Sequence, residues 1–99
     1  MLVRERETPE GLLVSVCDDD CLGETYENGE ITLAVDEEFY GGEEATEADA
    51  DTVVDALHRA SVANIVGERA IDVAIEAGLI DADRVLEVAE TKHAQLMWM

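Results

Sequence analysis

The stretch Gly11–Cys17, GLLVSVC, decides the fold class, because it is an almost unbroken apolar run of strand length. Strands that are buried on both faces have this composition, whereas half-exposed strands alternate apolar and polar residues. The preceding Thr8–Gly11 has proline second and glycine fourth, the residue order of a type I turn. We therefore predict that Gly11–Cys17 is a central strand and that Leu2–Glu7 pairs with it across this turn.

Further strand signals lie on both sides of the chain centre. Asn28-Gly29 separates the segments Glu24–Glu27 and Glu30–Val35, and this dipeptide is the strongest short signal for a β-hairpin. Nearer the C-terminus, Val85–Ala89 alternates like a strand and Ala94–Met99 is a second apolar run. The strand segments of the N-terminal half alone predict two or three antiparallel pairings.

The period of the apolar pattern changes between residues 46 and 78. Thr46–Asp49 resembles a capping box, and the positions that follow it recur at helical spacing: Ala50, Val53, Val54, Leu57 and Ala60. We expect Ser61–Val66 to continue this helix or to begin another. Glu68–Ala77 predicts a further helix with a broad apolar face, and Gly78 is placed to end it.

Strands, then helices, then strands again predict an α+β fold, a mostly antiparallel sheet with two or three helices packed on one face. The chain has no internal repeat and no linker-like tract, so residues 1–99 are expected to form a single compact domain. Apolar residues make up 47% of the chain and fall into periodic blocks, which favours a folded domain over a disordered acidic tail.

The 25 acidic and 6 basic residues give a net charge of −19. In molar salt the Debye length falls to about 3 Å, so such self-repulsion is largely screened. The composition therefore indicates adaptation to the salt-filled cytoplasm of a halophilic archaeon, and it reports habitat more than function. No segment has the layout of a signal peptide or the ~18 apolar residues of a membrane span. We expect a cytoplasmic protein with no membrane partner and with Cys17 and Cys21 as free thiols.

Five short motifs follow one another along the chain: Cys17-Asp18, Leu22-Gly23, Phe39–Gly42, Ala63–Glu68 and His93–Gln95. In this order and with these gaps they resemble the archaeal domain-of-unknown-function 424 family, small stand-alone proteins of about this length. The resemblance implies a shared fold and an archaeal cytoplasmic setting, and it supplies no established activity. In that pattern a proline usually precedes the His-Ala-Gln triplet, whereas Lys92 stands there in this chain.

The cysteines and histidines offer a candidate zinc set of Cys17, Cys21, His58 and His93. The two cysteines have the spacing of half a Cys₂His₂ site, but the histidines lie 35 residues apart instead of three to five. Asp18–Asp20 lacks the spacing of an EF-hand calcium loop and favours a solvated turn. We therefore predict no metal and no cofactor, with the Cys₂His₂ set as the alternative.

A small enzyme is the second alternative. Cys17 and His93 could serve as nucleophile and base, with Asp18 or Asn64 orienting the histidine. However, three aspartates follow Cys17, and negative neighbours raise the pKa of a thiol. The sequence therefore favours a non-catalytic role over a metal-binding protein or small enzyme that uses Cys17, Asp18 and His93.

The segment Phe39-Tyr40-Gly41-Gly42 is the most suggestive candidate for binding. Two aromatic residues followed by two glycines allow the backbone to bend sharply and to approach a ligand closely. Tyr40 could stack on a nucleic-acid base. Alternatively, Phe39 fills the core, Tyr40 caps its edge, and Gly41 and Gly42 form the turn into the next helix.

A second candidate surface combines Asn64, Gly67, Arg69, His93 and Gln95. Gly67 is expected to adopt a left-handed or close-approach conformation, and the polar side chains could together grip a partner. Our hypothesis is a non-catalytic binding module for RNA or protein, linked to translation or other information processing. Met97–Met99 either buries Trp98 or forms a dimer contact, so monomer and homodimer both stay open.

Overall fold

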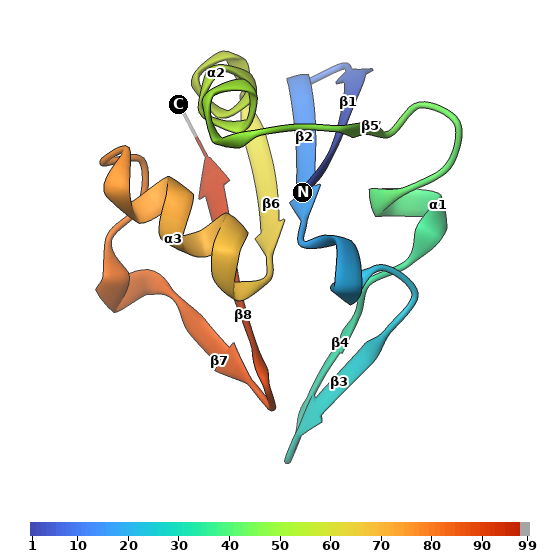
Figure 1. Ribbon diagram of the computed structural model, residues 1–99, viewed down its shortest axis with the longest axis vertical. Helices are drawn as coiled ribbons and strands as arrows, with labels where there is room; N and C mark the ends of the chain where they lie inside the picture. The colour runs from blue at the N-terminus through green and yellow to red at the C-terminus, as the bar shows by residue number, and fades with distance from the viewer. Residues whose placement is uncertain (98–99) are drawn as a thin grey trace.

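The computed structural model describes residues 1–97, which form a six-stranded sheet, a separate two-stranded hairpin and three α-helices (Figure 1). The strands of the large sheet are β1 (Leu2–Thr8), β2 (Gly11–Cys17), β5 (Thr46–Glu47), β6 (Val62–Val66), β7 (Leu86–Val88) and β8 (Thr91–Met97). The hairpin consists of β3 (Thr25–Asn28) and β4 (Ile31–Ala34), and the helices are α1 (Glu37–Tyr40), α2 (Ala50–Arg59) and α3 (Glu68–Glu76). Two short 3₁₀ turns are η1 (Asp19–Cys21) and η2 (Ala82–Arg84). The predicted burial of Trp98 concerns a residue outside this described part.

The strand order of the large sheet is β5-β1-β2-β6-β8-β7. β2 pairs antiparallel with β1 and parallel with β6, while the β1–β5, β6–β8 and β7–β8 pairs are antiparallel. Parallel neighbours need a long crossover, and here the chain passes through the hairpin, β5 and α2 before it enters β6. The α+β fold with a mostly antiparallel sheet is thus confirmed, and β2 is central, as its composition predicts.

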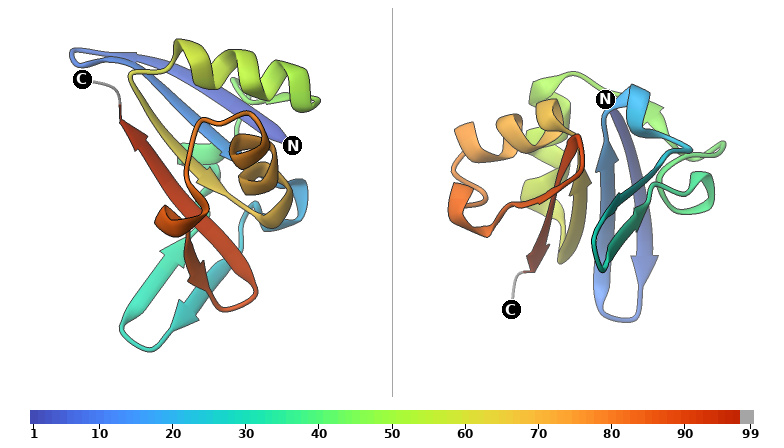
Figure 2. Two further views of the ribbon diagram at one scale, coloured as in Figure 1. Left: turned by 90° about the vertical axis from the view of Figure 1, so that its left-hand side faces the viewer. Right: turned by 90° about the horizontal axis from the view of Figure 1, so that it is seen from below.

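The main hydrophobic core lies between one face of the sheet and the helices α2 and α3 (Figure 2, right). Alternate strand residues point into it, because successive side chains of a strand face opposite sides. Its fully buried members include Val14, Val16, Ala63, Ile65, Val53, Leu57 and Ile71. No helix within residues 1–97 is long and apolar enough to cross a membrane.

The prediction of a helix at Ser61–Val66 is wrong. Val62–Val66 is the strand β6, with Ala63 and Ile65 buried under the helices and Val66 buried on the opposite face. Burial of Ala63 and Ile65 on one face and of Val66 on the other disturbs the alternation of the strand, and periodicity alone does not separate such a short apolar run from a buried helix. The β-branched residues at positions 62, 65 and 66 favour the strand.

The prediction of a capping box at Thr46–Asp49, with Thr46 as the N-cap, is also wrong. Thr46 and Glu47 form the edge strand β5, and the helix begins after Asp49, whose side chain accepts a hydrogen bond from the Thr52 N–H at 2.9 Å. Asp49 is therefore the N-cap of α2. At the end of α3, Gly78 has φ 74° and ends the helix as predicted.

A second, smaller cluster covers one end of the opposite face of the sheet. It is built from buried residues of β2, β6, η1, α1 and the segment after β4: Cys17, Val66, Cys21, Tyr40 and Val35. The hairpin carries the predicted Asn28-Gly29 dipeptide, although Asn28 pairs with Ile31 and the two loop residues are Gly29 and Glu30. Hence α2 and α3 share one face of the sheet, as predicted, while α1 and the hairpin lie on the other (Figure 2, right).

Candidate functional site

The carboxyl ends of the parallel strands β2 and β6 meet at a junction built around Asp18 and Gly67. The Asp18 carboxylate accepts hydrogen bonds from the backbone N–H groups of Arg69 at 3.0 Å and Ala70 at 2.9 Å. Asp18 therefore caps the N-terminus of α3 from a distant part of the chain. Gly67 has φ 113°, and a Cβ atom there would lie 2.3 Å from the Asp18 Cγ. The expected close approach at Gly67 is confirmed, and its physical purpose is to admit this carboxylate.

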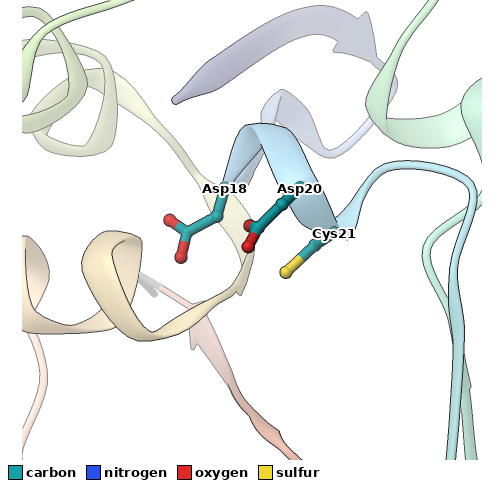
Figure 3. Close-up of side chains that lie close together, drawn as sticks. All are labelled: Asp18, Asp20 and Cys21. Carbon is teal, nitrogen blue, oxygen red and sulfur yellow. The ribbon is translucent and has the colours of Figure 1, made fainter.

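Beside this junction, Asp18, Asp20 and Cys21 form the group of potential metal ligands within residues 1–97 (Figure 3). One ligand atom from each lies within 4.8 Å of the others. The group borders a cleft of about 120 Å³ whose other lining residues are Tyr26, Glu68, Glu90 and Thr91. Two carboxylates and a thiol could hold a divalent cation, since carboxylate oxygen suits hard cations and thiolate suits zinc.

Cys21 and Asp18 already have partners within the protein. The Cys21 Sγ lies 3.7 Å from the Thr91 hydroxyl, and a hydrogen bond with Cys21, followed by burial, raises the pKa of Tyr26. Asp18 is already committed to two backbone N–H groups of α3. A cation here would therefore share Asp18 with the helix and would bind Cys21 as the thiolate, the form in which cysteine is a metal ligand.

The Cys₂His₂ set, the alternative to the prediction of no metal, is not assembled among the described residues. His58 is exposed on α2, which covers the opposite face of the sheet from the cluster that holds Cys17 and Cys21. Sequence reasoning thus missed Asp20 as a partner of Cys21. The signal that could have revealed it is the run Asp18–Cys21, in which three carboxylates directly precede a cysteine.

Cys17 and His93 lie in one row across the sheet, but Val66 stands between them. Neighbouring strands are about 4.8 Å apart, so residues two strands apart are separated by roughly twice that distance. Burial, followed by the nearby Cys21, raises the pKa of the Cys17 thiol to about 12, and burial lowers the pKa of His93. Cys17 is a neutral, fully buried thiol, an arrangement that opposes its role as a nucleophile.

The segment Phe39–Gly42 ends the short helix α1. Tyr40 is buried, and burial raises the pKa of its hydroxyl to about 12, whereas Phe39 is only half-buried. Their rings meet edge to face with centroids 5.0 Å apart, and the Arg6 guanidinium lies 5.8 Å from the Phe39 ring. The expected division of roles is therefore reversed, with Tyr40 in the core and Phe39 at its edge. A buried Tyr40 offers no open ring face for stacking on a base.

Asn64, His93 and Gln95 share one face of β6 and β8. Asn64 pairs directly with Gln95 across these strands, and His93 follows at the next position on the same side. Val62 and Met97 complete this surface, which we call the open face because α2 and α3 cover the opposite side.

Apolar exposure is concentrated around the open face. The described residues hold three exposed large apolar side chains, and two of them, Met97 at 60% and Leu86 at 44%, lie on its strands or beside them. Leu86 is paired with His93, so it shares the same side. Apolar side chains gathered on one face indicate an interaction surface more strongly than single scattered ones do.

Arg69 is not part of the open face. It lies in the first turn of α3, where it lines a shallow cleft of about 340 Å³ with Met1 and Asp18–Asp20. The structure therefore separates the predicted polar surface into two, with Asn64, His93 and Gln95 together and Arg69 beside the acidic turn.

Comparison with known proteins matches this chain to a family and to a solved structure, neither of which has an assigned activity. Residues 5–99 match the family model described as "Protein of unknown function (DUF424)". A crystal structure of an uncharacterized conserved protein from Methanopyrus kandleri is 28% identical, with a TM-score of 0.74 over 99% of this chain and 93% of that chain. No curated protein matches the sequence.

Proposed function

This chain belongs to the DUF424 family of proteins of unknown function, and we propose that it is a non-catalytic module that binds another protein through the open face. The observation that carries this proposal is the gathering of exposed Met97 and Leu86 with half-buried Val62 and the polar Asn64 and Gln95 on one side of β6–β8. Protein interfaces combine apolar side chains with hydrogen-bonding groups, and here the polar pair Asn64 and Gln95 lies between the rows that hold Met97 and Leu86.

The basic residues support a protein partner over RNA. Nucleic-acid binding needs Lys and Arg side chains that are available to phosphates. Arg4 and Arg6 both donate to the Glu38 carbonyl, and Arg59 forms a bidentate pair with the Glu5 carboxylate at 2.8 and 2.7 Å. These three of the six basic side chains serve the chain itself, and the other three, Arg69, Arg84 and Lys92, belong to three different elements, α3, η2 and β8.

The aromatic residues support the same choice. Single-stranded nucleic acids bind by stacking bases on exposed rings. Tyr40 is buried, and half-buried Phe39 is flanked by Tyr40 and by the Arg6 guanidinium. Tyr26 is half-buried and lines a cleft with the acids Asp20 and Glu90, whose carboxylates would repel phosphates, whereas the apolar part of the open face suits a protein.

The test is affinity capture from the native host in multi-molar KCl, with and without ribonuclease. Asn64→Lys places a bulky charge in the middle of the open face, and Thr52→Lys makes the same change on an exposed position of α2. We expect Asn64→Lys to lose the protein partners that the unchanged chain retains, and Thr52→Lys to keep them. Capture that disappears with ribonuclease, or that both variants retain, would reject the proposal.

A divalent-metal protein is the second candidate function, supported by the converging ligand atoms of Asp18, Asp20 and Cys21. Elemental analysis of protein purified without chelator would show one equivalent of metal, and Asp20→Asn would reduce it. Asp51→Asn, an exposed acid on α2, is the matched control. A metal-free protein, or equal loss in both variants, excludes this candidate.

A further inference from the structure

The outer edge of β8 is only half covered within residues 1–97. β7 pairs with β8 along Thr91–His93, whereas β6 pairs with it along His93–Met97. Residues Ala94–Met97 therefore have β6 on one side and no strand on the other in the described chain. An edge of this kind presents N–H and C=O groups that can pair with a further strand.

The hydrogen bonds between β6 and β8 show which backbone groups of β8 point to this edge. The Gly67 N–H donates to the Lys92 carbonyl at 2.9 Å, so the polar groups of Lys92 point toward β6. Since successive residues of a strand direct these groups to opposite sides, Ala94 and Leu96 also point toward β6. Gln95 and Met97 consequently direct their N–H and C=O groups outward, to the uncovered edge.

A groove runs along the same edge. It has a volume of about 290 Å³ and is lined by β8 residues Ala94–Met97 together with Gly78–Asp81 and Arg84. The segment that follows α3 forms the wall opposite β8. It brings the apolar side chains of Leu79 and Ile80 to the groove wall. The groove thus combines a backbone edge with an apolar wall, which are the two parts of a strand-addition site.

This edge lacks the usual protection against pairing. Natural edge strands carry charged residues, proline or a bulge that disfavours an added strand. Ala94–Met97 contains no charged residue and no proline, and its pairing with β6 continues without a bulge. None of these protective features therefore opposes an added strand along Ala94–Met97.

The charges around the groove define the chemistry of that partner. At the end of α3 and on η2 and β7, the exposed acids Glu76, Asp81, Asp83 and Glu87 outnumber two basic residues, exposed Arg84 and half-buried Lys92, which is paired with Glu87. Opposite charges in direct contact still attract in concentrated salt, because their separation is close to the Debye length of about 3 Å, so an occupant with Lys or Arg side chains fits this site and an acidic one does not.

We propose that the uncovered edge of β8 accepts an extended segment of a basic protein, which adds as a further strand beside Gln95 and Met97. This proposal rests on the proposed function and identifies its partner class. Backbone pairing would supply affinity, Leu79 and Ile80 would contact alternate side chains, and the outward acidic residues would meet the basic ones. The added strand would also widen the sheet whose uncovered side is the open face.

A capped peptide of alternating valine and lysine is the first probe, with a peptide of alternating valine and glutamate as its control. Amide hydrogen exchange is followed by NMR in the lowest KCl concentration that keeps the chain folded. We expect the lysine peptide to slow exchange at Gln95 and Met97 about tenfold when it is at roughly ten times its dissociation constant. Equal protection by the glutamate peptide, or protection elsewhere, overturns the proposal.

A proline variant tests whether the backbone is responsible. Gln95→Pro removes one outward N–H while keeping the inward groups that pair with β6, and proline is tolerated at such edge positions. Gln95→Ala removes the side chain and keeps the N–H. We expect Gln95→Pro to lose the peptide and Gln95→Ala to retain it; if Gln95→Pro does not fold, the exchange map of the unchanged chain decides.

The failure of this proposal can be told apart from failure of the proposed function. A folded Gln95→Pro that captures the same host proteins as the unchanged chain would reject strand addition and leave the open face as the binding surface. Absence of any protein partner for the unchanged chain would reject both. Protection of Gln95 and Met97 that depends only on the concentration of the chain would identify a second copy as the occupant and would also overturn the proposal.

Discussion

The two faces of the six-stranded sheet differ in what covers them, and β6 shows the difference within five residues. Ala63 and Ile65 are fully buried beneath α2 and α3, while Val62 and Asn64 on the other side remain only half-buried. The helix-covered face has an extended apolar core, whereas α1 and the hairpin protect just one end of the opposite face. We infer that stability resides on the first face and that the second leaves surface available for recognition.

The largest expected effect on stability separates neighbouring residues of β6. Ile65→Ala leaves a cavity in the main core and should lower the free energy of unfolding by about 2–5 kcal/mol. Asn64→Ala on the open face should change it by less than about 1 kcal/mol. Denaturant unfolding in concentrated KCl measures both. Similar losses of stability for the two variants would show that both faces contribute equally to the stability of the fold.

The next largest effect on stability is expected at the junction of Gly67 and Asp18. Gly67→Ala forces a side chain into the left-handed region and against the Asp18 carboxylate, which should cost about 2–3 kcal/mol through strain and a weakened helix cap. Gly78→Ala is the matched control, because Gly78 also has a positive φ of 74° and has nothing within 4 Å of the added Cβ. If both variants lose the same stability, the contact with Asp18 is not the reason for glycine at position 67.

The burial of Cys17 at the covered end of the second face predicts that its thiol reacts slowly. Cys17 is fully buried and its pKa is raised to about 12, so iodoacetamide should modify it at least about tenfold more slowly in the native protein than in denaturant. Mass spectrometry of a time course at neutral pH measures the difference. Rapid modification of native Cys17 would mean that this end is as open as the face beside it and would revive the nucleophile hypothesis.

The smallest expected effect concerns His93, at the boundary between the covered end and the open face. Burial lowers the pKa of its side chain below the ordinary 6.5. The unfolded chain therefore binds a proton first as the pH falls, so stability is retained above about 6.5 and decreases from there down to the native pKa. His93→Gln should remove this part of the pH dependence, as seen by unfolding between neutral and mildly acidic pH. An unchanged pH profile would place His93 in a solvent-like environment.

The sequence predicts well those elements whose signals are local. Gly11–Cys17, the hairpin around Asn28-Gly29 and the helix that Gly78 ends each carry their signal within a few neighbouring residues. The sequence predicts a helix for the residues of β6, and this prediction is wrong. The buried residues of β6 belong to two separate clusters, one on each face of the sheet. That burial depends on distant elements, and a short apolar run does not reveal it.

The candidate site also has features that depend on local sequence and features that depend on distant strands. The close approach at Gly67 is predictable, since glycine at a corner indicates unusual backbone geometry. The alignment of Asn64 with Gln95, and the separation of Cys17 from His93 by Val66, depend on strand register between segments about 30 residues apart or more. Register is set by the packing of the whole sheet, so the sequence alone could not show which polar residues would share a face.

One measurement tests the binding claim most directly, because the chain contains three side-chain carboxamides: Asn28, Asn64 and Gln95. Two of them lie on the open face and Asn28 lies in the hairpin. NMR of these side-chain NH₂ groups, with and without a captured protein partner, compares the surfaces within one sample. We predict that the signals of Asn64 and Gln95 shift while that of Asn28 stays in place. A partner that shifts neither open-face signal would contradict the assignment of this face as the binding surface.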